Sequence, residues 1–160
     1  QAMDANTIRA AHPAFVAILG QLSPDEARLL RHLVAHNDTP TITVRDLHPA
    51  LDPVRGQPWV GKLRNFTLVG EDAGCVAPSL ATAYLDNLAR LGIVEYRSPE
   101  QIADEQLYLR LEGSPDVARL RAGIETSAGH SVQIVRGFYS LTTFGRLLLA
   151  AAVRPGDAPY

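Results

Sequence analysis

The stretch that most constrains the fold is residues 78–96, where an amphipathic helix runs directly into a strand. Four apolar side chains recur there at spacings of four, four and three, namely Leu80, Tyr84, Leu88 and Leu91. This spacing places them on one face of a helix. Gly92 follows, at a position where a helix end favours a left-handed residue, and the β-branched and aromatic residues after it favour a strand. Such a corner buries its apolar face only if further helices cover it.

Two helices are predicted before this corner. The first spans residues 13–21 and begins with Pro13, which suits a first helical position. The second begins at Ser23, which we expect to act as the N-cap, with Pro24 in the first turn. Glu26 lies three residues after the cap and completes the pattern of a capping box.

The segment between the second helix and the corner is predicted to be mostly irregular. Residues 41–44 favour a short strand, and residues 46–48 could start a brief helix. Residues 52–76 contain many glycines and prolines, so we expect a long inserted loop with one strand within residues 62–69.

The C-terminal third is predicted to hold a helix, a strand and a last helix. Ser114 caps the first of these helices, and Val117, Leu120 and Ile124 share one face of it. Residues 132–141 favour a strand with a bulge or bend at Gly137. Thr142 or Thr143 caps the last helix, over residues 144–153.

These elements predict an α+β fold, mainly helical and winged-helix-like, with a long inserted loop and an extended wing. We expect residues 1–156 to form one domain and residues 157–160 to be a disordered tail. The predicted core comprises Leu29, Leu30, Leu33, Leu80, Tyr84, Leu88, Leu91, Ile93, Phe138, Leu141 and Phe144.

Composition excludes several classes of protein. The 160 residues are 46% hydrophobic, but no apolar run approaches the roughly 18 residues that a membrane helix needs, so we expect no membrane contact. Cys75 is the one cysteine, which excludes an internal disulfide and favours a reducing, cytoplasmic compartment. Because the chain starts at Gln1 and not at Met, we expect it to be the C-terminal part of a longer protein.

Four stretches occur in an order that resembles one known family. They are His12-Pro13-Ala14-Phe15-Val16, Gln21-Leu22-Ser23-Pro24-Asp25-Glu26-Ala27, Tyr84-Leu85-Asp86-Asn87-Leu88-Ala89-Arg90-Leu91-Gly92 and Leu141-Thr142-Thr143-Phe144-Gly145. The chain resembles the abortive infection alpha (Abi-alpha) family of bacterial proteins over nearly its whole length. This resemblance implies a role in phage resistance and supplies no catalytic motif.

The inserted loop holds a basic and aromatic cluster that could contact a partner. Its members are Arg45, Arg55, Trp59, Lys62, Arg64 and Phe66. Basic residues interleaved with aromatics can bind single-stranded nucleic acid, and they are also enriched at protein interfaces. A third interpretation is that the two aromatic side chains fold back and cover the core.

The helix over residues 80–91 would be the DNA-reading element of a winged helix, with Asn87 and Arg90 as candidate contacts. The wing that follows, residues 95–125, has seven acidic residues and four arginines, a net charge of −3. A wing of that sign would repel phosphate, so the sequence disfavours DNA reading.

No catalytic, cofactor or metal site is expected. His32 and His36 have a spacing that can chelate a metal, but a structural role near the helix end is the simpler interpretation. Cys75 lies among small apolar residues and is predicted to be structural and not a nucleophile.

The leading hypothesis is therefore a non-enzymatic interaction domain of a phage-defence protein. Its partner would be a protein, either a phage component or the missing N-terminal region. The alternatives are a winged-helix DNA-binding regulator or antitoxin-like repressor and, less favoured, an immunity protein that blocks a toxin.

Overall fold

The computed structural model describes residues 14–48 and 59–152. Within them the chain forms seven α-helices, one short 3₁₀ helix and four strands. The helices are α2 (Ala14–Leu19), α3 (Pro24–His36), α4 (Val69–Asp72), η1 (Pro78–Leu80), α5 (Ala81–Arg90), α6 (Glu105–Glu112), α7 (Pro115–Glu125) and α8 (Thr143–Ala152). The strands are β1 (Thr39–Leu47), β2 (Trp59–Phe66), β3 (Val94–Arg97) and β4 (Ser131–Leu141).

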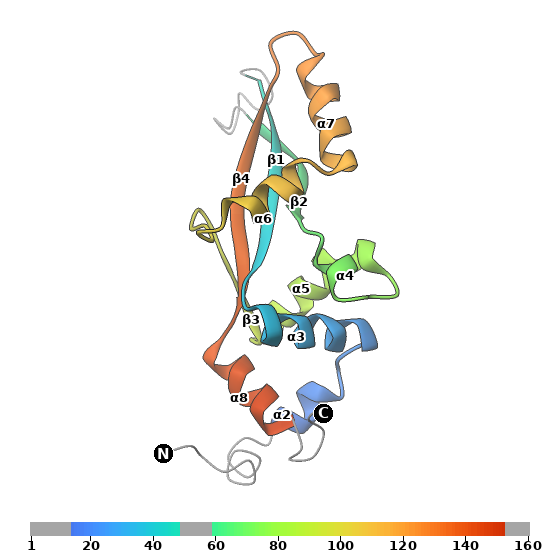
Figure 1. The fold of residues 1–160 in the computed structure, drawn as a ribbon, viewed down its shortest axis with the longest axis vertical. Coiled ribbons are helices and arrows are strands. Elements are labelled where there is room, and N and C mark those ends of the chain that lie inside the picture. The colour runs from blue at the N-terminus through green and yellow to red at the C-terminus, as the bar shows by residue number, and fades with distance from the viewer. Residues whose placement is uncertain (1–13, 49–58, 153–160) are drawn as a thin grey trace.

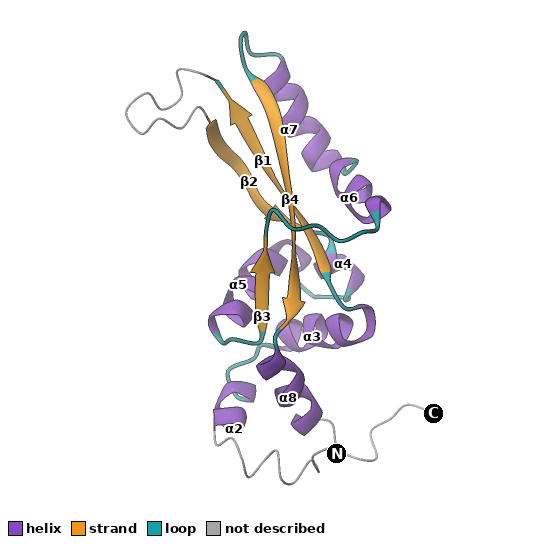
Figure 2. Ribbon diagram, turned by 90° about the vertical axis from the view of Figure 1, so that its left-hand side faces the viewer, coloured by secondary structure: helices purple, strands orange, loops and turns teal. Residues whose placement is uncertain are grey.

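The four strands form one antiparallel sheet in the order β2-β1-β4-β3. The long strands β1 and β4 run along most of the elongated molecule (Figures 1 and 2). At one end, α2, α3, α4, α5 and α8 gather around β3 and the end of β4, and we call this part the base. At the other end, α6 and α7 lie against β1, β2 and β4, and we call this part the arm. The prediction of an α+β fold is confirmed.

Base and arm each have their own apolar core on the shared sheet. The base core includes Leu29, Leu33, Leu85 and Leu88, all fully buried, with Phe15 and Leu148. The arm core consists of Ile42, Val44, Tyr108, Leu111, Val117 and Ile124. Strand β4 belongs to both parts, because its N-terminal half covers the arm core and its C-terminal half, with Tyr139 and Leu141, enters the base core.

The predicted capping box at the start of α3 is confirmed. The two carboxylates in this first turn also bind other parts of the chain. Ser23 and Glu26 exchange the expected hydrogen bonds, at 2.7 and 3.2 Å. The other carboxylate oxygen of Glu26 accepts from the Asn87 amide on α5 at 2.6 Å. Asp25 accepts from the backbone N–H groups of Val76 and Ala77, both at 2.9 Å. The N-terminus of α3 is therefore bound to α5 and to the loop that precedes it.

The corner between α5 and β3 is confirmed. Gly92 has φ +77°, and the Ile93 N–H donates to the Leu88 carbonyl at 3.0 Å, which is the hydrogen bond of a Schellman cap. Tyr96 on β3 faces Tyr139 on β4 in the sheet register.

The predicted apolar face of this helix is partly wrong. The α-helix begins at Ala81 because Pro78–Leu80 is a 3₁₀ turn, so the buried side chains are Ala81, Leu85 and Leu88. Leu80 is 49% exposed, and three more residues of the predicted core, Tyr84, Leu91 and Phe144, are half-buried. Tyr84 lies at the edge of the core because its hydroxyl donates to Asp25 at 3.3 Å.

Two predictions for the inserted segment are also wrong. Residues 46–48 do not start a helix, since Asp46 and Leu47 extend β1 by pairing with both neighbouring strands. Residues 52–76 are not mainly irregular over their described part, because they form β2 and α4; the strand predicted within residues 62–69 corresponds to β2, which begins earlier, at Trp59. Apolar residues such as Leu63 and Phe66 contact the arm core, and this tertiary packing outweighs the local turn signals.

The predictions for the C-terminal third are confirmed except at Gly137. Ser114 caps α7 and Thr142 caps α8, where its hydroxyl accepts from the Gly145 N–H at 2.9 Å. The register between β1 and β4 runs through Gly137 without a shift, so there is no bulge. A Cβ at this position would lie 2.6 Å from the Tyr96 hydroxyl, and this close approach is what favours glycine there. The predicted tail, residues 157–160, lies outside the described residues.

We predict that Leu88→Asp abolishes the cooperative unfolding of the domain. Leu88 is fully buried, and an unpaired carboxylate at such a site costs several kcal/mol, on the order of the whole stability of a small domain. Leu80→Asp is the matched control, because Leu80 is 49% exposed and lies just before the start of the same helix. Thermal unfolding followed by circular dichroism measures both. A cooperative transition retained by Leu88→Asp, or an equal loss in both variants, would contradict this packing.

We predict that Asp25→Asn destabilises the protein near neutral pH and has less effect in acid. The N–H groups of Ala77 and Val76 hold the pKa of the Asp25 carboxyl below its ordinary value of 3.8. Because the folded state lowers this pKa, the stabilisation is present above pH 3.8 and is lost as the pH falls through the folded-state value. Urea unfolding at neutral pH and below about pH 3 measures the difference between variant and wild type. Glu100→Gln, an exposed carboxylate, is the control, and a variant effect that does not change with pH would contradict the prediction.

Candidate functional site

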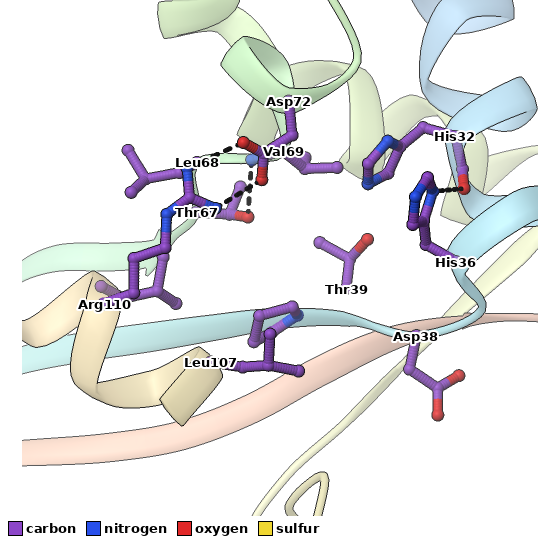
Figure 3. Close-up of a pocket in the computed structure, with 12 residues that line it drawn as sticks. His32, His36, Asp38, Thr39, Thr67, Leu68, Val69, Asp72, Leu107 and Arg110 are labelled. Carbon is purple, nitrogen blue, oxygen red and sulfur yellow. Dashed lines mark hydrogen bonds and ion pairs between the residues drawn. The ribbon is translucent and has the colours of Figure 1, made fainter. Parts of the chain in front are cut away.

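A cavity of about 510 Å³ with both polar and apolar walls lies where the base meets the arm (Figure 3). Its walls come from the last turn of α3, the start of β1, the segment that leads into α4, and α6. The apolar part of the wall includes Leu68 and Leu107, and the polar part includes two histidines, two threonines and an ion pair. The volume is in the range of sites for small molecules.

One wall of the cavity is an ion pair that joins the base to the arm. Arg110 on α6 contacts Asp72 on α4 with both terminal nitrogens, at 2.6 and 2.7 Å. The hydrogen bonds from Arg110 lower the pKa of Asp72 and raise the pKa of Arg110 itself. The pair stays ionised and its charges cancel, so it contributes no net charge to the cavity.

His32 and His36 form the opposite wall and lie on the same face of α3. Their rings are stacked, with centroids 4.2 Å apart and planes at 19°. The Nδ1 of His36 is 3.1 Å from the His32 carbonyl oxygen, which can only accept, so this nitrogen carries the proton. Burial lowers the pKa of His32, the charge of His36 lowers it further, and Asp72 partly opposes both effects. These effects together favour the neutral form of His32.

The metal-chelating interpretation of these histidines gains no support. In residues 14–48 and 59–152, no group of three or more His, Cys, Asp or Glu side chains is placed to hold a metal ion. Rings stacked nearly face to face turn their nitrogens alongside one another, whereas chelation needs nitrogens that converge on one point.

Two threonine hydroxyls complete the cavity. Thr39 is 2% exposed and lines the cavity. The Thr67 hydroxyl accepts from the Val69 N–H at 3.2 Å and keeps its own proton free to donate. Within the described chain, no hydrogen bond joins a hydroxyl to an imidazole at this cavity. The arrangement suits binding of a small polar molecule better than nucleophilic chemistry.

Cys75 lies outside this cavity and packs against the base core. Its Sγ is 3.7 Å from the Asp25 carbonyl oxygen. Burial raises the pKa of the thiol, and the charge of Asp25 raises it further. A thiol nucleophile needs the opposite shift, which favours the structural interpretation of Cys75.

The predicted contact residues fall into two separate groups. In the arm, the Arg45 guanidinium lies 4.0 Å above the Trp59 ring, and Arg45 donates to Gln133 at 3.3 Å. Lys62 is exposed and its ammonium is 3.9 Å from a carboxylate oxygen of Asp46. Arg55 lies outside the described residues. Phe66 covers the arm core, as one of the sequence interpretations expected.

The second group lies on or beside α5 in the base. Arg64 binds both carboxylate oxygens of Asp86, at 3.1 and 3.3 Å. Arg90 donates twice to the Asn87 side-chain oxygen, at 3.0 and 2.9 Å, while the Asn87 amide binds Glu26. Asn87 therefore helps to hold α5 against α3. The two arginines of this group, Arg64 and Arg90, each bind a side chain of the protein itself.

The base carries a further surface feature that sequence reasoning missed. A groove of about 560 Å³ runs between α2, α3 and α8, and we call it the apolar groove. Leu19, Leu22, Leu30, Val34 and Leu149 line it. The sequence placed Leu30 and Val34 on one apolar helix, but it could not reveal that Val34 remains 56% exposed while Leu30 is buried.

The fold is that of a small α+β protein with helices at both ends of one curled antiparallel sheet, and the comparisons assign it to a family. The chain belongs to the abortive infection alpha family, whose model matches residues 1–152. The predicted resemblance is therefore confirmed. No protein with a curated description matches the sequence.

The chain is also similar to a solved structure. That structure is of an uncharacterized protein from the hydrocarbon-degrading marine bacterium Alcanivorax borkumensis SK2, with 18% sequence identity and a TM-score of 0.55. The match covers 94% of this chain and 99% of the other. At this identity the likeness extends to the fold alone. Among the described helices, none has the length and apolar character needed to span a membrane.

We predict that the pKa of His32 is below its ordinary value of 6.5 and responds in opposite directions to two neighbours. His36→Gln removes a positive neighbour and should raise this pKa, whereas Asp72→Asn removes a negative one and should lower it. NMR titration of the imidazole protons measures both. His130→Gln, in the arm, is the control and should leave His32 unchanged. Shifts of the same sign in His36→Gln and Asp72→Asn would contradict this geometry.

Proposed function

We propose that this chain is a non-enzymatic, cytoplasmic interaction domain of a bacterial abortive-infection protein. Membership of the abortive infection alpha family supports the biological setting. We further propose that the domain binds a protein partner, and that the partner inserts an amphipathic helix into the apolar groove.

The observation that carries this proposal is the exposure of the apolar groove. Three helices form its walls, and Val34 is 56% exposed although its neighbours Leu30 and Leu33 are buried. Exposed apolar surface of this kind is costly in water and typically marks an interaction site. A groove between helices accepts the apolar face of another helix, whose backbone hydrogen bonds are already satisfied. The groove also holds arginines and no acidic residue, so it offers charge complementarity to one kind of partner.

The winged-helix-like interpretation of the base is part of this proposal. Helix α5 leads through Gly92 into β3, β3 pairs with β4, and β4 pairs with β1, an order that supports it. DNA reading by α5 has less support, because Arg64 binds Asp86 and Arg90 binds Asn87. The DNA-binding regulator and the immunity protein stay hypotheses that no contact in the described chain favours.

We predict that Val34→Glu removes phage protection without unfolding the protein. The substitution places a charge in the lining of the apolar groove, and a carboxylate there would have to be desolvated by any apolar helix that docks. Plaque formation on a bacterial strain that carries the complete protein measures protection, and circular dichroism of the purified chain measures folding. We expect plaque counts to rise to those of a strain without the protein.

Val76→Glu is the matched control. Val76 is 81% exposed and does not line the groove, so this variant should protect as the wild type does. Full protection by a folded Val34→Glu variant would contradict the role of the groove.

A further inference from the structure

Two arginines stand out because they line the apolar groove and bind no carboxylate or amide side chain of the described residues. Of the eleven arginines in residues 14–48 and 59–152, eight bind a carboxylate or an amide side chain. The three without such a contact in the described ranges are Arg31, Arg121 and Arg146. Two of these three, Arg31 and Arg146, line the apolar groove.

The two arginines belong to different walls of the apolar groove. Arg31 lies on α3 and Arg146 on α8, and both side chains belong to exposed residues. The other residues that line the groove are apolar. The groove therefore combines an apolar floor with positive charge from two sides and no negative charge, which is the complement of an acidic amphipathic helix.

From this arrangement we infer that the partner of the apolar groove is an acidic amphipathic helix, with carboxylates flanking its apolar face that bind Arg31 and Arg146. The inference rests on the proposed function and names the chemistry of the partner. Guanidinium groups bind carboxylates with two parallel hydrogen bonds, so the pairs would fix the register of the helix as well as attract it.

The described helices of a second copy of the chain do not fit this description. Helix α7 has two acidic residues and two arginines and is neutral overall. Helix α6 has two acidic residues and one arginine, but it buries Tyr108 and Leu111 in the arm core, and both of its carboxylates already bind Arg136. The groove is therefore not expected to be an interface between copies.

The terminal stretches of the chain itself do not fit either. Residues 1–13 contain one aspartate and one arginine, and residues 153–160 also contain one of each. Neither stretch carries the excess of carboxylates that two unneutralised arginines would select. An acidic segment outside residues 1–160 is thus the occupant that the charges favour.

The test uses two designed helical peptides of about 18 residues, long enough to hold helical structure. Both carry the same leucine-rich apolar face, and they differ only in having Glu or Lys on its two flanks. Fluorescence anisotropy measures their affinity for the full chain at low and high salt. We expect the wild type to bind the Glu peptide at least about ten-fold more tightly than the Lys peptide at low salt, and this preference to shrink as salt screens the charges.

The decisive variant is Arg31→Glu/Arg146→Glu, in which we expect the preference to reverse toward the Lys peptide. Arg119→Glu/Arg121→Glu on α7 makes the same change of charge away from the groove and should keep the wild-type preference. Circular dichroism confirms that each variant is folded.

The outcomes separate this inference from the proposed function. Equal binding of both peptides by the wild type, or a preference that Arg31→Glu/Arg146→Glu leaves unchanged, overturns the acidic-helix inference while the groove still accepts helices. Binding of neither peptide overturns the inference and counts against the groove as a docking surface. A reversal in the α7 control as well would show that net charge, and not the groove, selects the peptide, and would also overturn it.

Discussion

The fold depends on the two carboxylates that begin α3. Asp25 and Glu26 are both buried, and between them they accept hydrogen bonds from the α3 cap, from the loop before α5 and from α5 itself. Negative charge is favoured at a helix N-terminus, where the backbone N–H groups are unsatisfied. This cluster orients α5 on α3, and through Gly92 it orients β3 and the whole sheet. The residues of a local capping motif thus also join α3 to α5 and to the loop before α5.

The sheet connects the base to the arm. Strand β4 is buried in the base core at Tyr139 and carries Arg136 into the arm, where Arg136 binds Glu105 and Glu112 of α6 at 2.7 and 2.8 Å. Helix α6 returns to the base through the ion pair of Arg110 with Asp72. The cavity described above is lined by residues of both the base and the arm.

The proposed function rests on a surface that the packing of the base leaves uncovered. Helices α2, α3 and α8 bury one face each in the base core and leave the apolar groove between their outer faces. The groove combines exposed apolar area with unneutralised arginines, a combination found at protein interfaces. Family membership supplies the setting of abortive infection, and the groove supplies a physical means by which a domain of this family could recognise another protein.

The sequence by itself determined the elements whose signals are local. The capping box at Ser23, the glycine stop at Gly92 and the caps at Ser114 and Thr142 each depend on residues within a few positions of one another, and each lies where the pattern predicted. The ordered series of such signals also sufficed to indicate the family.

Only the tertiary structure decided which faces those elements bury and which residues meet. The sequence predicted one strand within residues 62–69, but the structure places β2 at Trp59–Phe66, where Leu63 and Phe66 contact the arm core. Asn87 was a candidate contact because the sequence placed it on an outward helix face. In the structure its side-chain amide donates a hydrogen bond to Glu26, which lies on a helix some sixty positions earlier. Val34 stays exposed because α2 and α8 stop short of covering it. Burial and long-range hydrogen bonds depend on the positions of distant segments, and no pattern within one segment contains that information.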